Sequence, residues 1–289
     1  MEPFYTSIVR GALVTALAAG LLWLVTRSTH AKEGLRLTVS RPAFLVPAAM
    51  ATAGVLGLMF AFGQRRVHDN PFLLATWIEG ETGLPSVLVV LLVAFALAGH
   101  VGLLEAHAAG RTPGSDAFLA GVRRHLTTFV LGKAVLALGI FGMVELLPDL
   151  RGYGLVLYLL PSLFAAPLAG VASSCPRRPV AALLGTFEFV RQNTFAAGRL
   201  VTAQAGLMIG LVYVGGRWFG AGAPPELLAP QASTLGYGHF PFVHLAGHGW
   251  AMSVVTVTSV LAGAAFVTAH WLLVRDAADP AADGLACAA

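Results

Sequence analysis

Three histidines within ten residues, His239, His244 and His248, are the feature of this sequence whose types and spacing most clearly suggest chemistry. His244 and His248 are four residues apart, which places both imidazoles on one face of a helix, where they can share a transition metal. His239 could fold back as a third ligand. Trp250 follows directly, and this neighbour favours the alternative of an aromatic and histidine belt at a membrane interface. We expect that alternative and assign no firm metal ligand, although a transition metal remains a possible cofactor.

A second pair, His100 and His270, stands in two different apolar stretches. Two histidines from facing helices can hold a b-type haem. Gly99, Gly102 and Ala269 would leave room for the ring, but small residues are common wherever membrane helices pack. A buried, hydrogen-bonded histidine is the more frequent explanation. We therefore expect no cofactor and keep haem b as an alternative.

Three ionisable residues, Lys133, Glu105 and Glu145, also lie within apolar stretches. Such residues are costly in lipid and face protein or water. Glu105 and Lys133 fall near the same end of neighbouring stretches, so we predict that they pair. Glu145 falls near the opposite end, where its side chain reaches the interface. A transport path would use such charges, and so would a purely structural ion pair, which is the commoner case.

No motif of a soluble enzyme is present. The sequence has no GxxxxGK[ST] phosphate-binding loop, no GxSxG nucleophile elbow and no HExxH. Cys175 and Cys287 lie far apart without metal-ligand spacing, and we expect neither a disulfide nor a zinc site from them. We assign no catalytic residue, and a non-enzymatic role is the stronger expectation.

The elements that must position these residues are apolar helices. Only 11% of the residues are charged and 57% are hydrophobic, whereas a soluble domain has about 25% charged residues. A membrane-spanning helix needs about 20 mainly apolar residues. The sequence predicts a single integral membrane domain over residues 1–289, an all-α polytopic bundle with seven spans, or six if the first is peripheral. The predicted spans are Phe4–Val25, Ala43–Gly63, Leu84–His107, Leu126–Leu147, Gly154–Ser174, Leu200–Trp218 and Gly249–Val274.

The basic residues predict the orientation. Twelve Lys and Arg residues fall in the segments 27–42, 108–125 and 175–199 and in the C-terminal tail, whereas four fall in the opposite connections. Positive charge stays on the cytoplasmic side. The N-terminus is therefore predicted outside and the C-terminus inside a bacterial or archaeal cytoplasmic membrane. The net charge of +4 arises from these basic connections. We therefore do not interpret it as a nucleic-acid-binding surface, and we expect no nucleic-acid partner.

Two of the basic connections, Asp116–Leu126 and Pro179–Gln192, have amphipathic patterns. Such helices lie at the lipid interface with basic residues towards anionic head groups, or they pack as connectors against the bundle. Each leads into a span through a similar phrase, which ends in Gly132-Lys133 and, 66 residues later, in Gly198-Arg199. This relation would be a parallel repeat.

The segments Ala117–Lys133 and Ala181–Arg199 carry a resemblance to a known group. An amphipathic helix that enters a span through an aromatic and a basic residue resembles the polytopic membrane proteins related to the membrane domain of some glycerophosphodiester phosphodiesterases. The resemblance implies a helical membrane domain with interfacial helices. It carries over no catalytic residue, because this chain has no phosphodiesterase domain.

These observations predict a non-enzymatic integral membrane protein that acts as an accessory, scaffold or assembly subunit. The expected partners are the lipid bilayer and other membrane subunits. A transporter or permease component for a small or amphiphilic solute is the first alternative. A haem- or metal-binding redox protein is the second.

Overall fold

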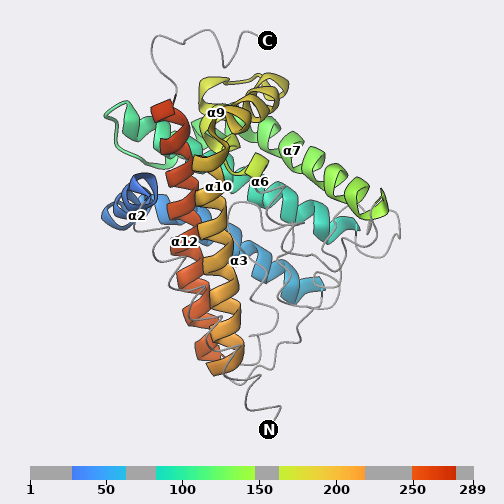
Figure 1. The fold of residues 1–289 in the computed structure, drawn as a ribbon. Helices are drawn as coiled ribbons and strands as arrows, with labels where there is room; N and C mark the ends of the chain where they lie inside the picture. The colour runs from blue at the N-terminus through green and yellow to red at the C-terminus, as the bar shows by residue number, and fades with distance from the viewer. Residues whose placement is uncertain (1–27, 63–82, 147–162, 219–248, 278–289) are drawn as a thin grey trace.

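The computed structural model describes residues 28–62, 83–146, 163–218 and 249–277. All regular structure in these ranges is helical, as expected, and none of them contains a strand (Figure 1). The elements are α2 (Thr29–Ser40), the short 3-10 helix η1 (Pro42–Phe44), α3 (Leu45–Phe62), α6 (Gly83–Ala108), α7 (Ser115–Leu146), α9 (Leu168–Ser174), α10 (Pro179–Trp218) and α12 (Gly249–Ala277).

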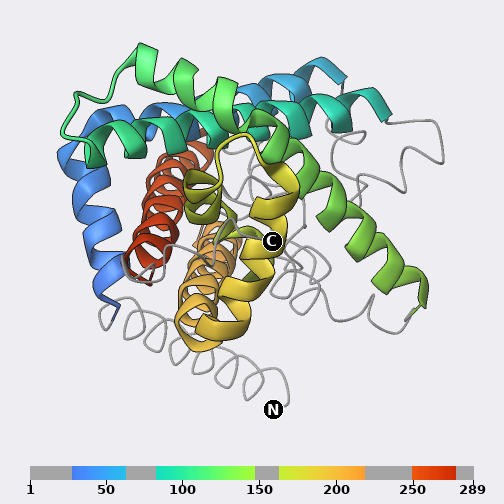
Figure 2. The ribbon, with the colours of Figure 1, turned by 90° about the horizontal axis from the view of Figure 1, so that it is seen from above.

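Helix α12 is the centre of the arrangement. It lies side by side with the second half of α10, and it also contacts α2, α3 and α9. Figure 2 looks along α12 and the second half of α10, and in the same view α3 and α6 lie lengthwise beside each other. The pair of α3 and α6 therefore crosses the pair formed by α12 and the second half of α10.

Two described helices contain a stretch that is long and apolar enough to cross a membrane. These stretches are Val90–Ala108 in α6 and Val260–Ala277 in α12, and both are mostly buried by the rest of the chain. Core helices of soluble proteins satisfy the same criterion. The predicted span Phe4–Val25 and the first part of Gly154–Ser174 lie outside the described residues, so the number of seven spans stays a prediction.

The segment between the first two predicted spans is a helix rather than a simple connection. Ser28 caps α2, its Oγ accepting a hydrogen bond from the Ala31 N–H at 3.2 Å. Gly34 lies so close to α12 that a Cβ atom there would stand 2.5 Å from the Ala265 carbonyl oxygen. The signal in the sequence is a stripe of small residues, because Ala31, Gly34 and Thr38 are the buried positions of α2.

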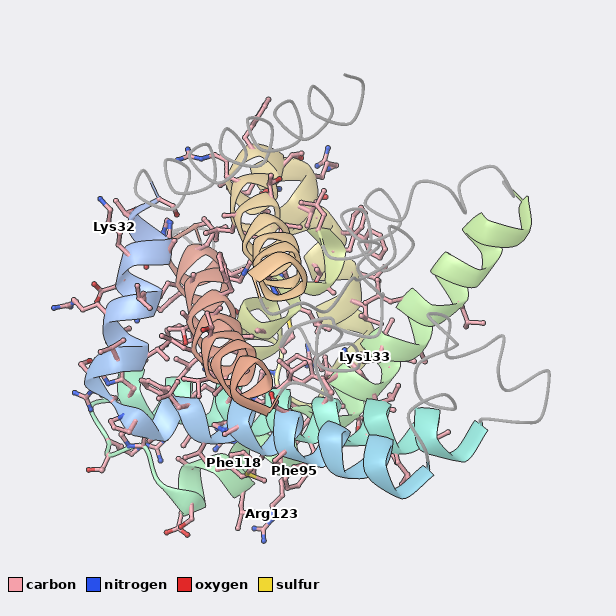
Figure 3. The ribbon with its side chains drawn as sticks, turned by 90° about the horizontal axis from the view of Figure 1, so that it is seen from below. Lys32, Phe95, Phe118, Arg123 and Lys133 are labelled. Atoms are coloured by element: carbon pink, nitrogen blue, oxygen red, sulfur yellow. The ribbon has the colours of Figure 1, made fainter. Side chains whose placement is uncertain are left out.

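Helices α6 and α7 form a tightly packed antiparallel pair with the most extensive contact in the described structure. Gly102 and Gly121 let the two backbones approach, since a Cβ on Gly121 would lie 2.5 Å from the Ala98 carbonyl oxygen. Phe118 packs edge-on against Phe95, with ring centroids 5.3 Å apart (Figure 3). Small residues at helix contacts are the usual means of close packing in membranes.

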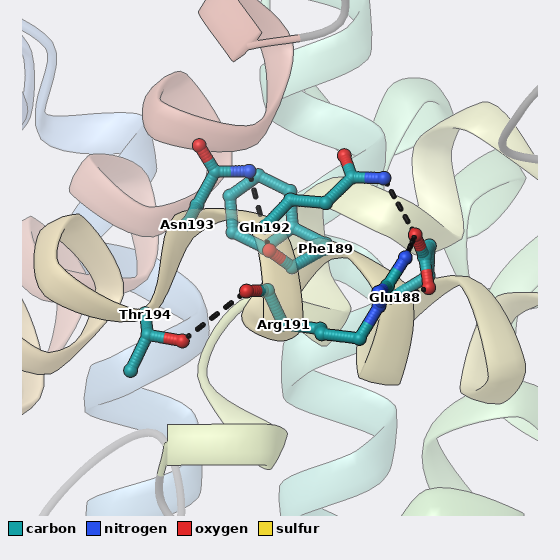
Figure 4. Close-up of polar contacts among 6 residues, drawn as sticks. All are labelled: Glu188, Phe189, Arg191, Gln192, Asn193 and Thr194. Atoms are coloured by element: carbon teal, nitrogen blue, oxygen red, sulfur yellow. Dashed lines mark hydrogen bonds and ion pairs between the residues drawn. The ribbon is translucent and has the colours of Figure 1, made fainter.

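The two predicted interfacial helices have different outcomes. The first, Asp116–Leu126, is continuous with the following predicted span as one helix of 32 residues. The second, Pro179–Gln192, is separated from its span because Asn193 has the non-helical angles φ −120° and ψ 30°. The Asn193 side-chain amide donates to the Phe189 carbonyl oxygen at 3.2 Å (Figure 4). We refer to residues 179–192 as the first segment of α10.

One expectation about cysteine is wrong. Cys175, which follows α9, is fully buried and is disulfide-bonded. Cys287 lies outside the described residues. The bond of Cys175 contradicts the expectation that it forms no disulfide.

Candidate functional site

Lys133 lies inside the helix assembly. Its residue is 7% exposed, and Figure 3 shows it in the interior, whereas Lys32 on α2 points outward. Gly132, just before it, allows close packing, since a Cβ there would come 2.6 Å from a methyl group of Leu168. Burial of Lys133 agrees with the rule that places ionisable residues of apolar helices against protein.

His270 lies in α12 and is 1% exposed. Its Nδ1 is 2.8 Å from the carbonyl oxygen of Phe266, one turn earlier. A carbonyl oxygen can only accept, so Nδ1 carries the proton and, in the neutral ring, Nε2 is a hydrogen-bond acceptor. That Nε2 is buried and has no hydrogen-bond partner among the described residues.

A cavity brings Lys133 and His270 together with a third polar residue, Gln204 of α10. Gln204 is 5% exposed. The cavity volume is about 30 Å³, which exceeds the 10–15 Å³ or so that one water needs. The rest of the wall is apolar and comes from α6, α7, α9 with the residues just before it, and α12, with Leu97, Phe129 and Val267 among its members. The site is therefore a small, mainly apolar pocket with three polar side chains, where five helices meet.

The predicted pair of Glu105 and Lys133 does not form the contact that the sequence suggested. Glu105 Oε2 is 3.3 Å from Arg124 Nη1, and its Oε1 is 2.8 Å from His125 Nε2. Lys133 lies eight residues beyond His125, about 12 Å further along α7. Glu105 thus belongs to a separate polar cluster at the end of α6, which joins this helix to α7.

His100 and His270 are both buried, but they do not face a common site. His100 Nε2 is 3.2 Å from Thr268 Oγ1. The Thr268 hydroxyl already donates to the Ala264 carbonyl oxygen at 2.9 Å, so His100 is the donor between them. Residues two apart on a helix point about 200° apart, so His270 faces away from the side of α12 that His100 contacts.

The surroundings of His100 do not fit a haem ligand. Its Nε2 is engaged with Thr268, and its ring stacks on Phe44 with centroids 6.0 Å apart and planes 12° apart. The glycines that were expected to leave room for a haem ring are instead packed against α7. Gly99 contacts the Phe118 ring, and Gly102 contacts the α7 backbone. A cavity of about 30 Å³ beside His270 also has no space for a porphyrin.

Two further sets of predicted residues have no described surroundings. Glu145 lies in the last turn of α7, and its side chain is outside the description. The cluster of His239, His244 and His248 lies outside the described residues altogether. In the described ranges, no group of three or more His, Cys, Asp or Glu side chains is placed to hold a metal.

Sequence reasoning missed Gln204 and His125. Gln204 stands in the apolar stretch Leu200–Trp218, where the rule that singled out Lys133 applies equally to a buried amide. His125 lies in the predicted interfacial helix Asp116–Leu126, yet its side chain is fully buried against Glu105. The amphipathic pattern placed it among basic neighbours, and only the contact with α6 shows its true environment.

No family model, curated protein or solved structure matches this chain.

Proposed function

We propose that this chain is a non-enzymatic integral membrane protein that acts as an accessory, scaffold or assembly subunit in a bacterial or archaeal cytoplasmic membrane. The observation that carries the membrane assignment is the exposure of large apolar side chains on several apolar helices. They are Met50 on α3, Leu91 on α6, Val135 and Leu138 on α7, and Val257 on α12, with exposed fractions from 39% to 68%. Lipid tails would cover this surface.

The crossing of the helices bears on how they sit in lipid. Helices α6 and α12 contain the two candidate spans, and α6 crosses α12 in Figure 2. If both cross one bilayer, at least one of them is tilted from the membrane normal, as many membrane helices are. A tilted arrangement agrees with the long, continuous α7.

The first segment of α10 supports an interfacial role. Its small residues Ala182 and Thr186 are buried against the other helices. Its larger apolar residues form the outer face of this segment, which consists of Val180, Leu184 and Phe187 and is 50% to 60% exposed. Spacings of four and three residues keep these side chains on one side. We assign the bilayer interface as the partner of this face, with Arg191 beside it towards the head groups.

Purification from membranes tests the accessory role. The tagged full chain should remain in the membrane fraction after an alkaline wash and should co-purify with a membrane subunit in fixed proportion. Release of the chain into the soluble fraction would contradict the membrane assignment. A chain that purifies alone and saturates with a solute would contradict the accessory role.

The polar cavity favours the second candidate, a transporter or permease component. A buried Lys, Gln and His from three different helices are the kind of groups that mark solute paths within membranes. Uptake of labelled solutes into vesicles that contain the chain tests this candidate, with Lys133→Met as the inactive control. The absorption spectrum and metal content of the same purified sample test the third candidate, the redox protein, through a Soret band or stoichiometric metal.

A further inference from the structure

The cavity between α7, α10 and α12 has an incomplete set of hydrogen bonds. His270 Nδ1 donates to the Phe266 carbonyl oxygen at 2.8 Å, which fixes the ring and leaves Nε2 as its free end. Nε2 is buried, lies in a residue that lines the cavity, and has no partner among the described residues. An unsatisfied buried polar atom is unfavourable, so a ligand that donates a hydrogen bond to Nε2 would stabilise this arrangement.

The other two polar side chains of the wall supply donors. Lys133 contributes an amine, which an anion beside it would keep protonated, and Gln204 contributes an amide NH₂. The described lining residues bring one formal positive charge and no carboxylate. Hydrogen bonds from a charged donor are about twice as strong as neutral ones. An occupant with negatively charged oxygen atoms is therefore favoured over a cation.

The size of the cavity restricts the occupant further. Its volume of about 30 Å³ corresponds to a few heavy atoms, because one water needs about 10–15 Å³ on the same scale. The remaining wall is hydrocarbon, including Leu97, Leu136 and Val267. A bulky or extended molecule does not fit, and neither does a group that needs many polar contacts.

We propose that this cavity binds a small, singly charged oxyanion that keeps one O–H group, the chemical class of hydrogencarbonate. Lys133 and Gln204 donate to its oxygen atoms, and its O–H donates to His270 Nε2. The buried His270 Nε2 then has a hydrogen-bond partner. This assignment concerns binding alone and goes beyond the accessory role, since a subunit of either proposed kind can hold such an anion.

The test compares two anions on the detergent-purified full chain. Hydrogencarbonate and nitrate are both planar and singly charged, but nitrate has no proton to donate. Isothermal titration should show saturable hydrogencarbonate binding, with nitrate at least about tenfold weaker, because one hydrogen bond to a buried acceptor is worth roughly that factor. No binding of hydrogencarbonate, or equal affinity for both anions, would overturn the proposal.

Variants assign the effect to the cavity. Lys133→Met should weaken hydrogencarbonate binding about tenfold or more, whereas Lys32→Met, the same change at the exposed lysine of α2, should leave it unchanged. His270→Phe should remove the preference for hydrogencarbonate over nitrate. Unchanged binding in the Lys133 variant, or an equal loss in the Lys32 variant, would contradict the assignment. Gel filtration checks folding, and Gln204→Leu replaces Lys133→Met if that protein does not fold.

Discussion

The carboxylate of Glu105 lies 2.8 Å from Nε2 of His125, and the contact joins the end of α6 to the first third of α7. The imidazole is fully buried, whereas the Glu105 side chain is 18% exposed. Arg124 adds a second, more exposed contact to the same carboxylate at 3.3 Å. The Glu105 carboxylate thus gives His125 Nε2 a hydrogen-bond partner, although solvent does not reach this ring.

Removal of Glu105 should destabilise the protein. Glu105→Ala leaves His125 Nε2 buried without its partner, which costs about 1–3 kcal/mol. Thermal unfolding in detergent, followed by circular dichroism, should show a lower Tm. Glu33→Ala is the matched control, because Glu33 pairs with Arg36 at 2.7 Å on the exposed side of α2, where ion pairs contribute little. Equal Tm values for the two variants would contradict this role of Glu105.

The close approach of α6 and α7 makes a second prediction. In Gly102→Ala the new methyl group would stand 2.6 Å from the Cα atom of Gly121, against backbone that cannot turn away. Overpacking of this kind costs about 1–3 kcal/mol. Gly139→Ala, further along α7, meets nothing within 4 Å and should be neutral or slightly stabilising, as Ala favours a helix over Gly. Comparison of the two Tm values shows whether close helix contact or helix propensity determines the effect of a Gly→Ala substitution on stability.

The apolar pattern predicted the positions of several helices well, and the tertiary contacts less well. The predicted stretch Leu84–His107 agrees with the bounds of α6. Its ends could be predicted because glycine and proline residues stand near both of them. In Asp116–Leu147, by contrast, a change from amphipathic to apolar pattern was interpreted as two elements, although no Gly–Pro or similar break interrupts α7. Such a change alters what surrounds a helix, and it does not end the backbone hydrogen bonding.

The prediction that Glu105 pairs with Lys133 is wrong for a geometric reason. Two antiparallel helices joined by the six residues 109–114 must pair positions that are about equally far from this connection. Gly102 therefore meets Gly121. Glu105 contacts Arg124 and His125, which lie somewhat further from the connection than Glu105 does. Lys133 lies much further from the connection and shares its cavity with Leu97 instead. Charge alone suggested Lys133 as the partner, whereas its distance from the connection places it too far along α7 to reach Glu105.

A third prediction concerns the carboxyl group of Glu188, in the first segment of α10. Side-chain hydrogen bonds from Arg191 and then from Gln192 lower its pKa below the ordinary 4.5. The stabilising contribution is therefore present above that ordinary value and is lost as the pH falls through the lower folded pKa. A carbon-detected NMR titration should find a pKa below 4.5 that rises in Arg191→Met and is unaffected by Arg36→Met. A value at or above 4.5 in the unaltered protein would contradict the contact shown in Figure 4.

The orientation gives a fourth prediction. Reporter fusions at Ala289 and near Pro230 should show a cytoplasmic C-terminus and an external loop, because of the twelve-to-four distribution of Lys and Arg. The disulfide bond of Cys175 points the other way, since such bonds are rare in the cytosol. The charge distribution spans four connections, so we give it more weight than one bond. Periplasmic reporter activity at Ala289 would reverse the orientation.

The interruption of α10 at Asn193 has a mechanical consequence for a protein in lipid. The two parts of α10 are joined by one residue with non-helical angles, so in a bilayer the part beside α12 could change its tilt while the first segment kept the interfacial position that we propose for it. A continuous helix would transmit the same tilt along its whole length. Membranes differ in thickness by a few ångströms, and helices adapt to this difference mainly by tilting. If the first segment lies at the interface as proposed, Asn193 would let the chain adapt to thinner or thicker bilayers without withdrawing Val180, Leu184 and Phe187 from it.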